Sequence, residues 1–487
     1  MRISKPFVLL CSVVTLLFGE LSLYAETRGF SWDEGFHLMA ARLIKEGKRP
    51  YLDFCFAQTP LNAYWNAVWL AIFGDSWRAV HAVSALLVAG AVLLTADFIL
   101  SRFPVADWRL GGALAAAFLV GLNGAIVVFG SIGQAYALCL FLTVAAFRVA
   151  VVAVDRRGAL YAAIAGLLAG AAAAASLLTA PVAPILLVWM LIYNRAGGRT
   201  PKLAAFLGGA AIPFLPVAWF FLQSPHVVFF NLVEYHALYR FVHWEGARQH
   251  DLEVLLGWID SGQALLLGLL AAAGMYFIAA RSGWERARRS EFYLCAWIAV
   301  LMGAEIANAH PTFSWYFLLV VPFVAIPAAA GLYAIGSQLF SPGRPLWPVT
   351  VLTVLLVLGL ARALYEDTGS LTWPDMEAVA KKVDQVTPRN ATLWAGENVF
   401  FLTRRPLPEG MEFQPATKLD MPMSQAAPLH ILPGPELQRR VKAGAYSTVA
   451  SCDEDQIKDM GLAQLYARKE ELGDCTVFWE WSGAKAR

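Results

Sequence analysis

The stretch FSWDEGFHLMAARLIKEGKRPYLDF, residues 30–54, decides how the chain is interpreted, because it places an acidic pair beside apolar sequence. It follows one apolar segment and precedes about ten more that are long enough to approach a membrane span. Only 15% of the chain is charged. A carboxylate near lipid is costly, so we expect Asp33 and Glu34 to serve a function.

Two compatible interpretations explain this pair. Ser31 and Glu34 have the spacing of a capping box, and Asp33 falls in the first turn, where the helix dipole favours an anion. His37 shares their helix face. In the second interpretation Asp33 is a general base facing a water-filled cavity at the membrane surface, while Glu34 caps the helix.

The composition indicates a polytopic membrane protein. The 487 residues are 58% hydrophobic, which excludes an ordinary soluble domain and a disordered chain. The net charge of +2 offers no basic stripe for nucleic acid. The six cysteines include no C-x-x-C pair, so neither a zinc site nor a redox motif is predicted. Residues 1–25 are interpreted as an uncleaved first helix, because their end is a poor cleavage site.

About eleven apolar runs approach the length of a bilayer span. They lie near residues 6–24, 78–99, 110–129, 134–152, 159–176, 178–193, 203–222, 255–280, 291–307, 314–336 and 346–365. Lys and Arg gather in alternate loops, which predicts a cytoplasmic N-terminus. The loop 25–77 and the segment from about 366 are then extracytoplasmic.

Two long outer loops carry the remaining polar groups. The first is predicted to contain amphipathic helices at 31–46 and 61–73, the second of them rich in aromatic residues and suited to the interface. The second loop, 223–254, contains Arg240 and Arg248, whose guanidinium groups could hold a phosphate, and His243 and His250, which could ligate a metal. Local ion pairs in a solvated loop are the alternative.

The segment 366–487 is predicted to be a small extracytoplasmic α/β domain. We expect helices at 373–386 and 454–471, and short strands at 391–394, 447–450 and 476–481. Cys452 and Cys475 flank the last helix in an oxidising compartment, so they are expected to form a disulfide, with two buried thiols as the alternative.

The first loop resembles that of the GT-C glycosyltransferases. The matching features, in order, are the acidic pair, the amphipathic helix, Gly47-x-x-Pro50-Tyr51-x-Asp53, Pro60-Leu61 and Phe73-Gly74. The branch that matches contains protein O-mannosyltransferases and bacterial aminoarabinose transferases of lipid A. Thr59 and Gln134 depart from the pattern, where relatives often have proline and an acidic residue.

The resemblance implies a GT-C membrane domain over 1–365, a periplasmic α/β domain over 366–487, and a bacterial inner-membrane location. It implies an inverting transferase that moves a sugar from a polyprenyl-phosphate donor to a hydroxyl of a lipid, glycan or protein acceptor. Asp33 is then the general base, with Glu34 beside it. The residues expected to bind substrate are His37, Tyr51, Asp53, Arg240, His243, His310 and Tyr316.

The same residues bear on cofactors and on an alternative function for the protein. No nucleotide loop is present, and no metal ligands are assigned, although a divalent cation between Asp33, His37 and Asp53 is an open alternative. A multi-pass lipid or small-molecule transporter is the alternative function. It would place its ionisable residues at midspan, whereas most of them here lie at the outer surface.

Overall fold

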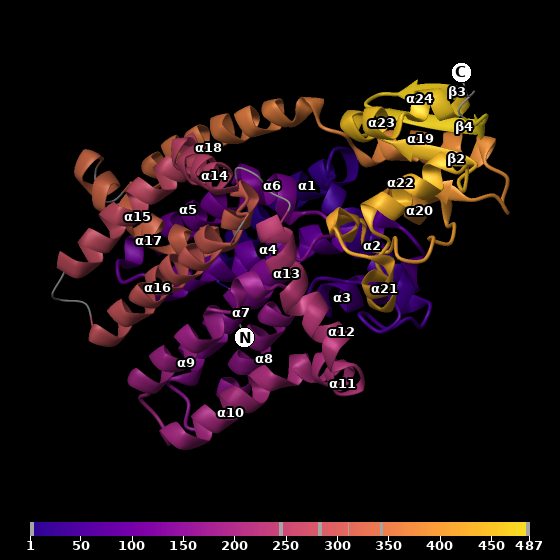
Figure 1. The fold of residues 1–487 in the computed structure, drawn as a ribbon. Coiled ribbons are helices and arrows are strands. Elements are labelled where there is room, and N and C mark those ends of the chain that lie inside the picture. The colour runs from indigo at the N-terminus through magenta and orange to yellow at the C-terminus, as the bar shows by residue number, and fades with distance from the viewer. Residues whose placement is uncertain (1–3, 243–246, 281–284, 310, 341–343, 484–487) are drawn as a thin grey trace. The chain divides into compact units, whose positions relative to one another are not determined.

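The computed structural model describes residues 4–242, 247–280, 285–309, 311–340 and 344–483 (Figure 1). The chain forms two compact units. The first contains residues 1–26, 81–216 and 246–369, and the second contains residues 27–80, 217–245 and 370–487. Each is described by itself below.

The first unit is helical and follows the predicted apolar runs. Within the described residues, eight helical segments are long and apolar enough to span a bilayer, or nine if one bent pair counts as a span. Two shorter apolar helices, α8 (Leu160–Ala175) and α9 (Val182–Ile192), cover two further predicted runs. The long segments are built from α1 (Lys5–Thr27), α4 (Trp77–Arg102), α7 (Tyr136–Ala153), α10 (Arg199–Ala211) with α11 (Leu215–Gln223), α15 (Gly262–Ala280), α16 (Arg286–Asn308), η5 (Ser314–Val320) with α17 (Val321–Leu339), and α18 (Leu346–Glu366).

The bent pair consists of α5 (Arg109–Gly121) and α6 (Gly124–Gly130), which meet at 53°. The break leaves backbone groups without helical partners, and Gln263 on α15 satisfies two of them. Its Oε1 accepts the Gly124 N–H at 2.8 Å, and its Nε2 donates to the Leu122 carbonyl at 2.9 Å and to the Leu356 carbonyl on α18 at 3.0 Å. One side chain therefore stabilises the broken span against two other helices.

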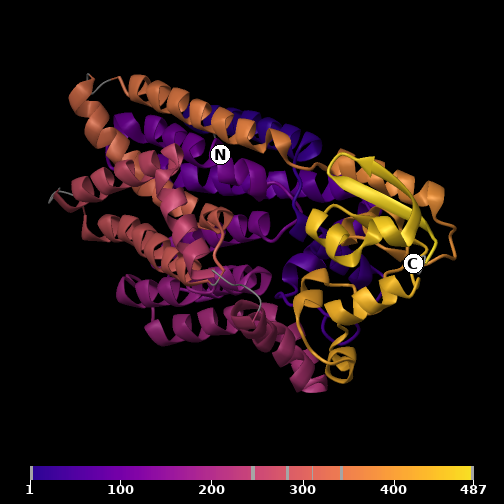
Figure 2. The same cartoon turned by 45° about the horizontal axis from the view of Figure 1, so that its top comes forward.

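Close helix approach in this unit depends on small residues. Gly274 on α15 and Gly331 on α17 lie where an added Cβ would collide with the backbone of the opposite helix. Such close contacts replace the hydrophobic driving force, which is weak between helices in lipid. α18 runs as one long helix in Figure 2.

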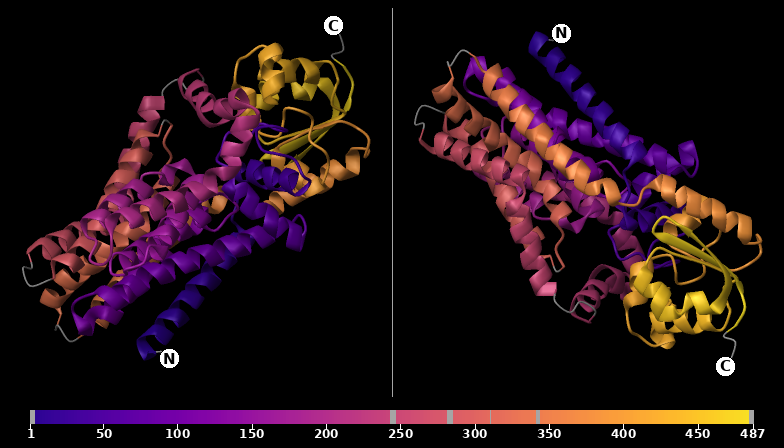
Figure 3. Two further views of the ribbon diagram at one scale, coloured as in Figure 1. Left: turned by 90° about the horizontal axis from the view of Figure 1, so that it is seen from below. Right: turned by 90° about the horizontal axis from the view of Figure 1, so that it is seen from above.

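The second unit contains a four-stranded sheet in the order β1-β2-β4-β3. β1 (Leu393–Trp394) is parallel to β2 (Thr448–Ser451), and β4 (Cys475–Trp481) is antiparallel to both β2 and β3 (Tyr466–Leu472). Figure 3 shows β3 and β4 as a hairpin (yellow). A disulfide joins Cys452, just after β2, to Cys475 at the start of β4.

The expected helix over 454–471 is wrong in its second half. α23 (Glu454–Met460) and α24 (Leu462–Leu465) are helical, but the chain then enters β3. The charged run in β3 favours a helix when it is taken alone. It forms a strand because Gly473, at φ 58°, allows a two-residue turn that pairs Leu472 with Cys475.

The remaining elements of the second unit come from three separate parts of the chain. They are α2 (Trp32–Lys45), α3 (Leu61–Phe73), α12 (Pro225–Phe229), the π-turn η4 (Phe230–Glu234), α13 (Tyr235–Val242), α19 (Trp373–Val386), α20 (Glu397–Thr403), η7 (Gln414–Lys418) and α22 (Gly434–Lys442). The predicted helices at 31–46, 61–73 and 373–386 are confirmed by α2, α3 and α19.

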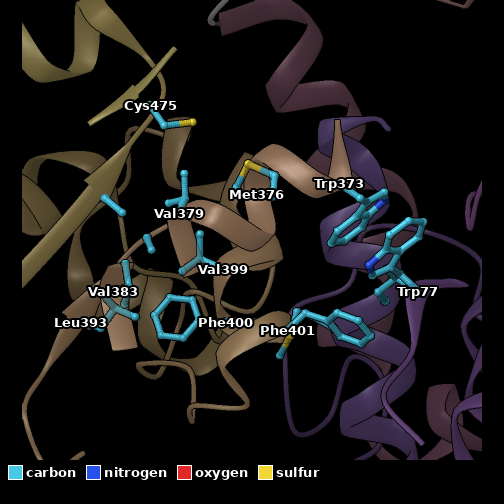
Figure 4. Packing of buried hydrophobic residues seen from close by; sticks show 14 of the residues in the cluster. Trp77, Trp373, Met376, Val379, Val383, Leu393, Val399, Phe400, Phe401 and Cys475 are labelled. Atoms are coloured by element: carbon cyan, nitrogen blue, oxygen red, sulfur yellow. The ribbon is translucent and has the colours of Figure 1, made fainter. Parts of the chain in front are cut away.

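The first loop packs with the C-terminal region within the second unit. One hydrophobic cluster contains residues of α2 and α3, the start of α4, α19, α20 and the sheet. Figure 4 shows Trp77 and Trp373 lying face to face in this cluster, near Phe401. The predicted boundary at 365/366 lies close to the point, after Gly369, where the chain enters the second unit.

Candidate functional site

The acidic pair opens α2 as expected, but the capping box does not form. Ser31 occupies the N-cap position and makes no side-chain capping bond. Glu34 is fully buried instead, and its carboxylate accepts a hydrogen bond from Trp373 Nε1 at 2.9 Å. Trp373, also fully buried, stacks on Trp77 with ring centroids 5.3 Å apart. The first residue of α19 therefore fixes the residue next to Asp33.

A second contact holds α2 against the C-terminal region. An added Cβ at Gly35 would collide with the side chain of Asn398 and lie 3.2 Å from its backbone nitrogen, so only glycine permits this approach. Two turns further along, Arg42 donates from its NH1 atom to the Phe400 carbonyl at 3.1 Å. α20 therefore packs along the helix that carries Asp33.

Asp33 itself presents a face to solvent. Asp33 interacts electrostatically with Lys418, Tyr235 and Glu397, and it is desolvated by its surroundings. This burial raises the pKa of the Asp33 carboxyl group, and the positive charge of Lys418 at the end of η7 opposes the rise. An accessible carboxylate with a raised pKa is a better proton acceptor than one in bulk water.

Glu397 is the second titratable group at this position. It is 7% exposed, and its Oε1 accepts the backbone N–H of Gln414 at 2.7 Å. Burial raises the pKa of Glu397 to about 7, and the negative charge of Asp33 contributes to the rise.

The loop after α2 is held by its own contacts. Arg49 and Asp53 form a bidentate pair, with NH2 to Oδ1 at 2.8 Å and Nε to Oδ2 at 3.0 Å, which lowers the pKa of Asp53. Tyr51 is fully buried at φ 71°, and its hydroxyl donates to the Gln58 carbonyl at 2.8 Å. In this structure Tyr51 therefore stabilises the loop, and its role toward a substrate stays a prediction.

The structure also describes His37 and the other two residues of the open cation alternative. His37 is buried near Asn62, and desolvation lowers its pKa to about 3. It therefore stays neutral and has little contact with solvent. Across the described residues, no three acidic, histidine or cysteine side chains, Asp33, His37 and Asp53 included, gather as a metal-binding group. Asp53 is already engaged by Arg49.

The predicted phosphate ligands lie mostly beyond what the structure describes. His243 and His310 are outside the described residues, and Arg240 is described only as part of the backbone of α13. Tyr316 belongs to η5 in the first unit, where its ring lies 6.2 Å from that of Tyr136 and 5.4 Å from that of Phe313. The roles of these residues stay predictions.

The first unit contains a cavity of about 480 Å³ that is lined in part by Ser314 and Trp315 of η5. His250 at its edge is held by the Thr312 carbonyl, 3.0 Å from Nε2. The lining combines aromatic and polar side chains, among them Asn123, Phe129, His250, Glu253, Ser314 and Trp315.

Three important residues of the second unit were missed from the sequence. Asn231, in the π-turn, accepts the Phe56 N–H at 2.8 Å and so joins segment 217–245 to the first loop. Trp373 was expected to start a helix, but its bond to Glu34 was not. Glu397 was not considered. A π-helical turn gives no periodic signal in the sequence. The other two interactions, of Trp373 with Glu34 and of Glu397 with Asp33, connect residues more than 300 positions apart.

These features define a multi-pass membrane protein with the GT-C fold. No family model and no curated protein matches the sequence. Among solved structures, the chain is similar to ArnT from Cupriavidus metallidurans bound to undecaprenyl phosphate, with a TM-score of 0.67, 14% identity and 99% of both chains covered.

The same enzyme in its apo state gives a TM-score of 0.64 at 15% identity, with 97% of both chains covered. The oligosaccharyltransferase AglB from Archaeoglobus fulgidus, in complex with an inhibitory peptide and a dolichol-phosphate, gives 0.54 at 14% identity. That match covers 98% of this chain and 75% of AglB. At these identities the comparisons establish the fold.

Proposed function

We propose that this protein is a glycosyltransferase that moves a sugar from a polyprenyl-phosphate donor to an acceptor hydroxyl at the extracytoplasmic face of a bacterial inner membrane. The observation that carries the proposal is Asp33, an accessible carboxylate whose pKa is raised by burial at the start of a rigidly held helix. The fold supports it, because ArnT and AglB, which share the fold, were solved with polyprenyl-type phosphates bound.

In the proposed reaction Asp33 accepts the proton of the acceptor hydroxyl. The hydroxyl oxygen attacks the anomeric carbon of the sugar, and the bond from that carbon to the phosphate oxygen breaks. Polyprenyl phosphate leaves with the bonding electron pair, and attack from the opposite side inverts the anomeric centre. General-base assistance of this kind contributes about 10²–10⁴-fold to the rate.

Glu34 supports this step by position. Its buried carboxylate is bound to Trp373, so it fixes the first turn of α2 rather than meeting the acceptor. Lys418 places a positive charge near Asp33, which favours the ionised carboxylate and opposes the rise in its pKa that burial causes. Arg240, His243, His310 and Tyr316 remain our candidates for holding the donor phosphate.

The orientation in the membrane is part of the proposal. A cytoplasmic N-terminus places the first loop and the C-terminal region on the periplasmic side, in agreement with the charge pattern of the loops. The disulfide between Cys452 and Cys475 supports this side, because disulfides persist in oxidising compartments.

The experiment is a transfer assay in bacterial membranes that contain wild type, Asp33→Asn or Asp455→Asn. Asp455 is an exposed carboxylate on α23 and serves as the matched control. The donors are undecaprenyl phosphates linked to radiolabelled hexoses or pentoses, and label is followed into lipid, glycan and protein. We expect transfer with wild type and Asp455→Asn and none with Asp33→Asn. If no donor yields transfer, the proposal fails and lipid translocation is the next assay.

A further inference from the structure

Glu397 is a buried carboxyl group that the transfer step above does not use. It opens α20, and its carboxylate is held by the Gln414 N–H at 2.7 Å. The next residue, Asn398, is the one that packs against Gly35 on α2. Glu397 therefore belongs to the segment that lies directly against the start of the helix bearing Asp33.

Charged and titratable groups of other elements interact at this position. Asp33 on α2 interacts electrostatically with Glu397, with Tyr235 on α13 and with Lys418 at the end of η7. Lys418 favours the ionised form of Asp33, and the charge on Asp33 in turn disfavours ionisation of Glu397. The pKa of Glu397, about 7, therefore depends in part on the charge of Asp33.

We infer that Glu397 is a positioning residue that sets the base strength of Asp33. The inference rests on the proposed transferase function. When Glu397 is protonated, it is neutral and leaves Asp33 as the single anion. When Glu397 releases its proton to solvent, the second negative charge makes Asp33 hold a proton more tightly, so Asp33 becomes a stronger base. The same charge repels the anionic phosphate of the donor.

Glu397→Gln tests this, because glutamine resembles the protonated acid and keeps an acceptor for the Gln414 N–H. The assay uses purified full-length protein and a radiolabelled undecaprenyl-phosphate sugar, with kcat and KM measured from about pH 6 to about pH 8. In wild type, both kcat and KM rise across the ionisation of Glu397. In Glu397→Gln both stay flat and match the wild-type values at the acidic end.

Glu454→Gln is the control, since it removes an exposed carboxylate of the same unit that pairs with Lys458. It should follow the wild-type profile. The inference is overturned if Glu397→Gln retains the wild-type pH step, or if it lowers kcat by the same factor at every pH, as a purely structural role would.

A second measurement needs no donor. The melting temperatures of wild type, Asp33→Asn, Glu397→Gln and the double variant are compared at about pH 5 and about pH 8. Glu397→Gln should raise the melting temperature at the higher pH, and the gain should be smaller in the Asp33→Asn background. At the lower pH the two substitutions should be additive, because Glu397 is neutral there.

The two measurements separate the two proposals. Additivity at both pH values overturns the role of Glu397, whatever the transfer assay shows. If the two substitutions couple at the higher pH but the wild type transfers no sugar, the transferase function is overturned. The electrostatic interaction between the two carboxyl groups then stands without it.

Discussion

The bond from Trp373 to Glu34 is the contact through which we expect the C-terminal region to stabilise the start of α2. In Trp373→Phe the indole N–H is lost and a fully buried carboxylate loses a donor 2.9 Å away. Hydrogen bonds to charged groups contribute about 1.5–3 kcal/mol. At about 1.4 kcal/mol for each factor of ten, this predicts roughly 10- to 150-fold faster opening of α2.

The assay is hydrogen–deuterium exchange of the backbone amides of α2 in the full-length protein, read by mass spectrometry. Trp481→Phe is the matched control, because Trp481 is 41% exposed at the end of β4, where it pairs with Tyr466 of β3. We expect the control to leave exchange in α2 unchanged.

A double-mutant cycle with Glu34→Gln isolates the pair. Once the glutamate is neutral, loss of the indole donor should cost less, so the two substitutions should couple by more than about 1 kcal/mol. The reasoning is refuted if Trp373→Phe leaves exchange in α2 at the wild-type rate, or if the two effects simply add.

Three further predictions concern the same unit. Gly35→Ala should destabilise the unit by about 1–3 kcal/mol, because the added methyl group meets the side chain of Asn398. The melting temperature should fall in Gly35→Ala and rise part of the way back when Asn398→Ala is added. Cys452→Ser should cost about 3 kcal/mol, since it opens a disulfide that closes 23 residues of chain; a melting temperature insensitive to reductant in wild type would contradict it. Arg78 lowers the pKa of Glu377, so Glu377→Gln should cost at most about 1 kcal/mol near neutral pH, and the difference should vanish in melts as the pH falls through that lowered pKa.

Local patterns made most of the fold predictable. The amphipathic spacing between residues 31 and 46 and the glycine that follows it located α2 within a residue or two at each end. The apolar runs located the helices of the first unit, including both halves of the bent pair near 110–129. The wrong helix prediction at β3 also comes from relying on local patterns. A strand rich in charged residues at the edge of a sheet carries no alternating apolar pattern.

The candidate site was only partly predictable for a physical reason. Asp33 was identified because a carboxylate beside apolar sequence needs an explanation. The partners of the acidic pair could not be identified, because Trp373 meets Glu34, and Glu397 approaches Asp33, only in the folded structure. The predicted capping box of Glu34 does not form, because Glu34 bonds instead to Trp373. Trp373 offers a donor inside the core, whereas the cap lies at the surface.

The most direct test of the central claim is the rate of sugar transfer by purified full-length protein reconstituted in vesicles, with wild type and Asp33→Asn compared at equal amounts of folded protein. The donor is the radiolabelled undecaprenyl-phosphate sugar that gives transfer in membranes. If Asp33 is the general base, its replacement lowers kcat by about 10²–10⁴-fold while donor binding is retained. Transfer by Asp33→Asn at the wild-type rate would contradict the account.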